Sequence, residues 1–342
     1  MMSVRRLAAI LALALALPAA ALSQPLTVGT VGTSSDAPFF IADKKGYFKD
    51  AGIEVTFIRF DSAAQMIAPL GAGQLDAGGG ATSAALFNAA KRDIKIRIVA
   101  DKARNAAGYG LQALLVRKDL ADKIKDYKDL KGLKIATSAV GNSESSLLNE
   151  ALKKGGLKLA DVEQVYIGFP QHPAAYANGG IDASITTEPT ISAILKAGSA
   201  VRKFGVDEFF PNHQTAVTFY GEDFVAKKPE AAKKFMQALL RGFRFYNDAL
   251  QGGHLAGANA EEAIAILTEY SIIKDPAIYR AITSHAVDPD GGVDMASLTK
   301  DWQFFKDGGQ IDGSVAVDKV VDMSFARAAV QALGPYKSAA QR

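Results

Sequence analysis

A chain of 342 residues, of which 49% are hydrophobic, is long enough to form two domains that each bury a core. Its 39 Lys and Arg residues nearly balance its 36 Asp and Glu residues, so the chain lacks the clustered positive charge that nucleic-acid binding requires. It contains no cysteine, which excludes disulfides, thiol catalysis and a thioether-linked lipid anchor.

The first 23 residues have the pattern of a secretory signal peptide. Arg5 and Arg6 form a positive n-region, residues 7–17 are all Ala, Leu or Ile, and small residues follow. The apolar run is shorter than the ~20 residues of a membrane-spanning helix. We predict cleavage near Ser23 and Gln24, with a competing site after Ala21. The mature chain, with 37 basic and 36 acidic residues, is expected to be free in a Gram-negative periplasm.

Short apolar strands then alternate with helical patterns. This alternation predicts an α/β fold with largely parallel sheets. The first helix should end at Gly46, and Ala64, Ile67 and Leu70 recur at helical spacing in the second. The expected strands cover residues 26–31, 53–60, 76–78 and 94–98, and the expected helices cover 38–45, 62–70 and 83–90.

The same alternation continues through the middle of the chain and gives way to helices after residue 220. The C-terminal part is expected to be helical throughout, with Asp275-Pro276 starting one helix and Asp294 capping another. The middle strands are expected at 111–116, 134–136, 165–167, 183–185 and 215–220, with helices at 143–154 and 189–196. The long C-terminal helices are expected around Phe235 to Leu250 and over 317–333.

Two near-repeats occupy equivalent places in the chain. The sequence GQLDA at 73–77 is followed by a polar loop, and so is GGIDA at 179–183. This duplication predicts two similar lobes with a cleft between them. We expect the extended segments 111–116 and 215–220 to be crossovers that form a two-segment hinge. Lobe 1 would then comprise 24–113 and 219–342, and lobe 2 would comprise 114–218.

Four segments resemble those of nitrate/sulfonate/taurine-type periplasmic substrate-binding proteins. They are APFFIADKKGYFKDAGIEV at 37–55, GQLDA at 73–77, KDLKGLKI at 128–135 and TEP at 187–189. That family supplies the solute receptors of ABC importers and shares a domain with thiamine-pyrimidine precursor proteins. The resemblance implies a type II periplasmic-binding-protein fold, no catalysis, no cofactor and an inner-membrane permease as partner.

The candidate ligand site consists of polar loops between strand ends and helix starts, where open α/β sheets bind ligands. Glycine lets a backbone N–H approach a ligand closely, and helix N-termini attract anions. Helix capping is the alternative role for each of the hydroxyls. The candidates in these loops are Ser34, Ser35, Asp36, Gly80, Thr82, Ser83, Ser138, Gly141, Asn142, Ser143 and Glu188.

Two charged residues, Glu188 and Arg104, each have two expected roles. Glu188, held extended by the proline that follows it, could accept from an amine or ring N–H, or it could stabilise the next helix. Arg104 could clamp a carboxylate, or it could be a solvated loop residue. His213 is expected to face the hinge. Four scattered histidines without paired spacing predict no metal site.

No catalytic pattern is present in the sequence: it has no Gly-x-Ser-x-Gly elbow and no Walker-type Gly-Lys-(Ser/Thr). We therefore expect a monomeric receptor for a small anionic or zwitterionic organic molecule, such as a sulfonate, a taurine-like compound or a carboxylate. Two alternatives stay open. One is a periplasmic hydrolase or transferase on the same two-lobe scaffold, and the other is a receptor for a pyrimidine-type heterocycle.

Overall fold

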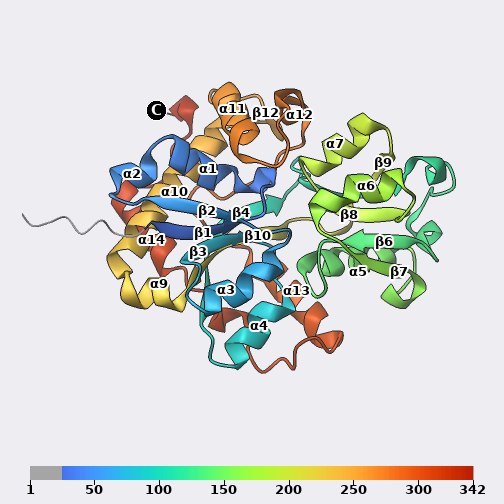
Figure 1. The fold of residues 1–342 in the computed structure, drawn as a ribbon, viewed down its shortest axis with the longest axis horizontal. Coiled ribbons are helices and arrows are strands. Elements are labelled where there is room, and N and C mark those ends of the chain that lie inside the picture. Colours follow the sequence, from blue (N-terminus) through green and yellow to red (C-terminus); the bar gives the residue numbers. More distant parts are fainter. Residues whose placement is uncertain (1–24, 342) are drawn as a thin grey trace, which may run out of the picture.

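The computed structural model describes residues 25–341 and shows two lobes side by side, each built around one five-stranded sheet (Figure 1). The predicted signal peptide, residues 1–23, lies outside the described residues. Between residues 25 and 341, no helix combines the length and apolarity needed to cross a membrane.

The sheet of the first lobe has the strand order β2-β1-β3-β10-β4. β1 pairs in parallel with β2 and β3, whereas β10 is antiparallel to β3 and β4. The strands are β1 (Leu26–Thr30), β2 (Val55–Arg59), β3 (Ala77–Gly80), β4 (Ile96–Asn105) and β10 (His213–Gly221).

Helices cover both faces of this sheet. One face packs against α1 (Ala37–Lys44), α2 (Tyr47–Asp50), α9 (Glu222–Lys227), α10 (Pro229–Ala249), α11 (Ala260–Tyr270), α12 (Pro276–Ala281) and α14 (Ser324–Leu333). The other packs against α3 (Ile67–Gly71), α4 (Ala84–Lys91) and α13 (Met295–Asp307). The 21-residue helix α10 lies at the centre of the first layer, where Phe235 stacks on Phe48 with 4.8 Å between ring centroids.

The sheet of the second lobe has the order β7-β6-β8-β5-β9, which repeats the layout of the first. Here β5 is the antiparallel strand, paired with β8 and β9. The strands are β5 (Gln112–Arg117), β6 (Lys134–Thr137), β7 (Glu163–Tyr166), β8 (Ala183–Thr187) and β9 (Ala200–Gly205). The helices are α5 (Ser143–Lys154), α6 (His172–Ala177), α7 (Thr190–Ala197) and α8 (Val206–Phe209). The duplication expected from the near-repeats is therefore present in the fold.

The predicted crossovers need correction. Segment 111–116 forms most of β5 inside the second sheet, and 215–220 lies inside β10 of the first sheet. The chain instead crosses just before each of these strands, at 106–111 and at 210–212, as the sheet pairings require. A strand paired within a sheet and an extended segment that crosses between the lobes have the same apolar sequence pattern. The sequence alone therefore could not distinguish the two. We propose to place the lobe boundaries at these two crossings.

Two details of the C-terminal part also differ from the prediction. The segment after residue 220 is not helical throughout, because β11 (Leu250–Gln251) and β12 (His254–Leu255) form a small hairpin. The helix expected over 317–333 is interrupted, and only 324–333 form α14. The interruption has a clear cause: Ile98 of β4 donates to the Val320 carbonyl at 2.7 Å and accepts from Asp322 N at 2.8 Å, which pulls the chain along the sheet edge.

Candidate functional site

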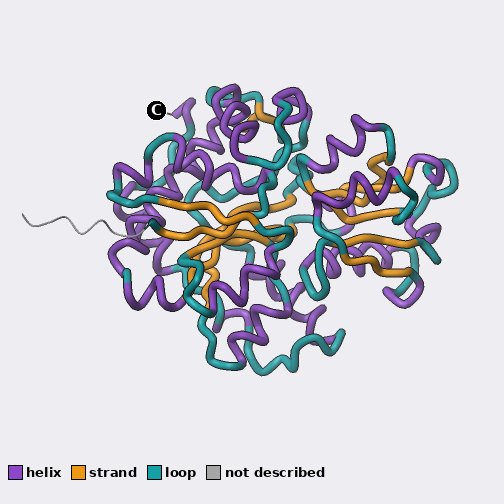
Figure 2. Tube along the Cα trace, in the orientation of Figure 1, coloured by secondary structure: helices purple, strands orange, loops and turns teal. Residues whose placement is uncertain are grey.

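The loops that follow the parallel strands of both sheets meet at the boundary between the lobes. In Figure 2 the loops (teal) fill the space between the two sets of strands (orange). Ser83 and Asn142 form an antiparallel bridge, Ala84 N donates to the Gly141 carbonyl at 2.8 Å, and Ser143 N donates to the Thr82 carbonyl at 3.1 Å.

A second contact joins the lobes on the other side. Ser34 N and Ser34 Oγ both donate to the main-chain carbonyl of Glu188, at 3.2 and 3.1 Å. We call these two sets of contacts the interlobe seam; it comprises residues 33–36, 82–84, 138–144 and 186–190. The structure thus brings the four predicted loops together, in a closed arrangement of the lobes.

The two candidate glycines serve the geometry of these loops. Gly141 has φ of +66°, in the left-handed region that favours glycine, and its carbonyl accepts from the first lobe. A Cβ on Gly80 would lie 2.4 Å from the Ala63 Cβ, so close packing requires glycine there.

An ion pair that the sequence did not reveal lies beneath the first loop. The Lys102 Nζ is 2.9 Å from Asp36 Oδ1 and donates to Ser35 Oγ at 2.7 Å, and neither the lysine nor the aspartate side chain is exposed. Asp36 Oδ2 also accepts from the N–H groups of Val31 and Thr33, both at 3.1 Å. Burial lowers the pKa of Lys102, and the Asp36 charge opposes that shift. Asp36 therefore anchors the loop and neutralises a buried cation.

The second lobe holds a buried carboxylate of its own at the seam. Glu144 Oε2 accepts from Ser138 N at 2.7 Å and from Asn142 Nδ2 at 3.1 Å. Asn142 also caps α5 by accepting from Ser145 N, and it donates to Ser138 Oγ. Burial raises the pKa of Glu144 to about 7. Sequence reasoning missed Glu144 because it falls within the predicted helix, where a glutamate reads as part of a solvated face.

The side chain of Glu188 is engaged with the helix that follows it. Its carboxylate accepts from Ser192 N at 3.0 Å and from Ser192 Oγ at 3.1 Å. Burial raises its pKa to about 7. Of the two roles expected for this residue, the helix-stabilising one has a contact in the structure.

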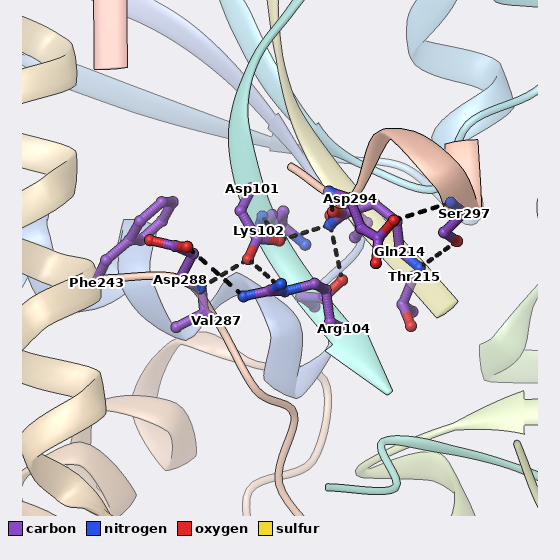
Figure 3. Close-up of polar contacts among 12 residues, drawn as sticks. Asp101, Lys102, Arg104, Gln214, Thr215, Phe243, Val287, Asp288, Asp294 and Ser297 are labelled. Atoms are coloured by element: carbon purple, nitrogen blue, oxygen red, sulfur yellow. Dashed lines mark hydrogen bonds and ion pairs between the residues drawn. The ribbon is translucent and has the colours of Figure 1, made fainter. Parts of the chain in front are cut away.

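Arg104 lies within β4, in a separate cluster from the seam loops. Its guanidinium contacts Asp101 Oδ2 at 3.2 Å and Asp288 Oδ2 at 3.8 Å (Figure 3). Arg104 was expected in a loop after the strand at 94–98, and this is wrong: β4 continues to Asn105, so Arg104 is a strand residue. His213 begins β10 directly after the second crossing, and its Nε2 lies 3.2 Å from Asp301 Oδ2 of α13.

Several buried hydroxyls near the strand ends have no hydrogen-bond partner among residues 25–341. Three of them, on Thr82, Ser83 and Ser143, are predicted site residues, whereas the hydroxyls of Ser34, Ser35 and Ser138 have partners. The unpartnered set comprises Thr82, Ser83, Thr137, Ser143, Thr186 and Thr190. A buried hydroxyl without a partner is costly, so these groups are available to a bound polar molecule.

The described residues contain no group of three His, Asp or Glu side chains that could hold a metal ion. The seam therefore offers neutral hydroxyl donors and acceptors, one buried lysine already paired, and two buried glutamates. The unpartnered hydroxyls of this set can form hydrogen bonds with a small polar molecule.

The profile of the NMT1/THI5-like family matches residues 33–249. The chain belongs to the NMT1/THI5-like family. Within it, the taurine-binding periplasmic protein of Escherichia coli is 28% identical over 64% of this chain and 66% of its own length. The 4-amino-5-hydroxymethyl-2-methylpyrimidine phosphate synthase of Schizosaccharomyces pombe is 26% identical over 59% of each chain. The match to this NMT1/THI5-like chain thus covers less than two thirds of the length of each of these two relatives.

Solved structures share the fold of this NMT1/THI5-like protein. The alkanesulfonate-binding protein of Xanthomonas axonopodis, solved with MOPS bound, has a TM-score of 0.69 at 19% identity, over 87% of this chain and 98% of that one. A Candida albicans protein described as having the generic periplasmic binding protein fold has a TM-score of 0.68 at 18% identity, over 87% and 96% of the two chains. The expected periplasmic-binding-protein fold, with two mixed sheets of mainly parallel strands, is confirmed.

Proposed function

We propose that this protein is the solute receptor of an ABC importer, which closes its lobes on one small organic molecule and delivers it to a permease in the inner membrane. The observation that carries the proposal is the interlobe seam, where both lobes contribute buried hydroxyls without partners. Relatives named for taurine binding, and a similar fold that binds alkanesulfonates, support an anionic or zwitterionic ligand.

Within this proposal, the predicted site residues divide into two groups. Thr82, Ser83 and Ser143 contact the solute directly, because their hydroxyls have no partner in residues 25–341. Asp36, Asn142 and Glu188 hold the loops in place through the contacts described above. The protein acts as a periplasmic monomer after cleavage near Ser23 and Gln24.

The test is a thermal-shift screen of sulfonates, taurine, carboxylates, nitrate and pyrimidines, followed by scattering with the ligand that binds. A ligand that binds only the folded state raises stability by about 2.7 kcal/mol at a hundredfold excess over its Kd. We expect stoichiometric binding and no new product. Turnover of the ligand, or a screen with no shift, would count against the receptor.

A pyrimidine-type ligand is the second candidate, because the family also includes the pyrimidine phosphate synthases. The same screen separates the two, since a pyrimidine and taurine differ in charge and in ring. Product analysis by mass spectrometry after incubation with the pyrimidine tests the enzymatic alternative at the same time.

A further inference from the structure

Buried side chains bridge both crossings between the lobes. The first crossing, residues 106–111, leaves β4 after Asn105 and enters β5 at Gln112. Its first part is a tight turn, in which Tyr109 N donates to the Ala106 carbonyl at 2.8 Å. Asn105 pairs within the sheet of the first lobe and Gln112 within that of the second, and both side chains are buried. A contact between these two side chains therefore joins the lobes.

Asn105 makes that contact with both ends of its carboxamide. Its Oδ1 accepts from Gln112 N at 3.1 Å, and its Nδ2 donates to Gln112 Oε1 at 3.2 Å. The same Nδ2 donates to Thr215 Oγ1 of β10 at 2.6 Å. An amide nitrogen carries two N–H donors, so each of its two acceptors can receive one. One side chain thus connects the strand that enters the second lobe to the strand that returns from it.

The second crossing, residues 210–212, is bridged by a contact between rings. Phe210 packs in the apolar core of the second lobe, and its ring centroid lies 4.7 Å from that of His213, the first residue of β10. His213 is the strand partner of Asn105 in the first sheet, and its Nδ1 lies 3.5 Å from Thr215 Oγ1. The bridges of the two crossings are therefore in contact with each other. We call these five residues the hinge clamp: Asn105, Gln112, Phe210, His213 and Thr215.

The bonds of the hinge clamp that span a crossing are specific to the closed arrangement. Rotation of one lobe against the other must change backbone torsions in the two crossings. Asn105 and Gln112 lie at the two ends of the first crossing, and Phe210 and His213 at the two ends of the second, so rotation changes the separation within each pair. Hydrogen bonds weaken steeply when their geometry departs from the preferred range. These contacts therefore stabilise the closed arrangement relative to an open one.

The first crossing also ends next to the interlobe seam. The carbonyl of Leu111, the last residue of the crossing, accepts from Glu188 N at 3.0 Å. The carbonyl of Glu188 in turn accepts from Ser34 N and Ser34 Oγ of the first lobe. A displacement of Leu111 relative to β4 thus displaces the main chain that Ser34 binds. The hinge clamp and the loops of the candidate ligand site are separated by one residue of main chain.

We propose that Asn105 is the positioning residue of the hinge: through Gln112 and Thr215 it joins the two crossings, so that they turn together and the closed arrangement is populated before a solute binds. This inference rests on the proposed receptor function and deepens it. Asn105 acts on the solute through the relative position of the lobes and not by touching it.

Distances between two spin labels test this role directly. The chain has no cysteine, so Thr56→Cys in β2 and Glu163→Cys in β7 place one label on each lobe, at exposed positions. Both strands are at the edge of their sheet away from the hinge clamp. Pulsed electron paramagnetic resonance then gives the distance distribution without solute. Asn105→Leu keeps the size of the side chain and removes its hydrogen bonds, so the ratio of closed to open populations should fall about fivefold or more.

Asn247→Leu is the matched control. The Asn247 Nδ2 donates to the carbonyls of Phe243 and Val287, at 3.0 and 3.2 Å, so it makes the same kind of hydrogen bond within the first lobe alone. Its loss should lower the unfolding temperature and leave the distance distribution unchanged. A folded Asn105→Leu protein with the wild-type distribution overturns the proposal, and so does a wild-type distribution in which the closed arrangement is not populated.

Thr215→Val covers the case in which Asn105→Leu does not fold. It keeps the shape of the side chain and removes the hydroxyl that accepts from Asn105, so it should shift the distribution in the same direction. In the double variant the two shifts should be less than additive, because both changes remove the same hydrogen bond. An unshifted Thr215→Val distribution contradicts the proposal. The readout needs no solute, so a solute screen without binders counts against the receptor function and leaves the role of Asn105 to be decided by these distances.

Discussion

Single residues of the seam include two buried carboxyl groups, those of Glu144 and Glu188, for which the described residues show no ion pair. Glu144 and Glu188 are held by N–H and O–H donors, yet burial raises the pKa of each to about 7. Asp101, which lies in β4, has its pKa raised to about 6 by the same cause, and the charge of Arg104 opposes this shift. At all three carboxyl groups, burial raises the pKa by more than the hydrogen bonds lower it. Such groups make the stability of the closed protein depend on pH.

The sign of that dependence follows from proton binding. The unperturbed value for Glu144 is 4.5, so between about pH 4.5 and 7 the native state keeps a proton that the unfolded state has lost. The native state binds more protons, so the free energy of unfolding falls as pH rises through this window. One such group contributes a slope of up to about 1.4 kcal/mol per pH unit.

Glu144→Gln should therefore flatten the pH dependence of stability. Urea unfolding at pH 5, 6 and 7 is expected to show a smaller loss of stability with rising pH in the variant than in the wild type. Glu188 and Asp101 remain in both proteins, so the difference isolates Glu144. Glu163→Gln, at an exposed position in β7, removes the same charge and should leave the slope unchanged. Parallel slopes for wild type and Glu144→Gln would show that Glu144 titrates normally.

The residues of the candidate site were partly predictable for a physical reason. Hydroxyl-bearing residues and glycines between a strand and a helix indicate a loop that could line a ligand site. The structure places these loops at the interlobe seam. Lys102 could not be found this way, because it lies inside a strand that was expected to end before it.

Among the elements, one glutamine connects strands β4 and β10 to the start of α13. Gln214 Nε2 donates to Asp101 Oδ1 at 2.6 Å and to the Ala216 carbonyl at 2.9 Å, while Oε1 accepts from Asp294 N at 2.8 Å (Figure 3). Gln214 N donates to Ser297 Oγ at 2.7 Å. The side chain thus satisfies buried groups on β4, β10 and the cap of α13.

Gln214→Ala should be strongly destabilising. It leaves the Asp294 N–H and the Ala216 carbonyl without this partner, and each unsatisfied buried group costs about 1–3 kcal/mol. We expect a loss of about 2–4 kcal/mol in the free energy of unfolding by urea. The control Gln303→Ala, on the exposed face of α13, should change the free energy of unfolding by less than about 0.5 kcal/mol. Equal stability of the two variants would remove Gln214 from this role.

Helices and strands with a strong local sequence pattern could be predicted. Elements that form only by pairing with a distant strand could not. Helix 143–154 was predicted at the bounds the structure shows, because Asn142 caps it and a clear apolar stripe runs along it. The strand β9 and the interruption before α14 went unpredicted. β9 forms by pairing with β5, and the interruption before α14 forms by pairing with β4. A single sequence does not show which segments pair with each other.

At the scale of the whole molecule, the closed arrangement is held by contacts that cross the seam at its rim. Phe169 of the second lobe is only 6% exposed and packs into the apolar cluster of the first lobe that contains Val31 and Met66. Ion pairs join α5 to α13 (Glu150 with Lys300, 2.7 Å) and α7 to the start of α12 (Lys196 with Asp275). In each ion pair only the lysine is well exposed, and pairs of this kind contribute little, so Phe169 is the main apolar lock.

Phe169→Ala should therefore favour the open form without unfolding either lobe. Removing most of the buried ring weakens closure by about 2 kcal/mol, which lowers the apparent affinity for the solute by about thirtyfold if only the closed form binds. Small-angle scattering should show a larger radius of gyration without ligand, and compaction at saturating ligand.

Phe204→Ala is the matched control for this lock. Phe204 stacks on Tyr127 within the second lobe, with 4.0 Å between ring centroids, and so contributes to that lobe rather than to closure. Its loss should lower the unfolding temperature while leaving the scattering profile and the affinity near those of the wild type. If Phe169→Ala behaves like Phe204→Ala, closure does not depend on the Phe169 contact. The polar contacts of the interlobe seam and the two ion pairs would then have to hold the lobes together.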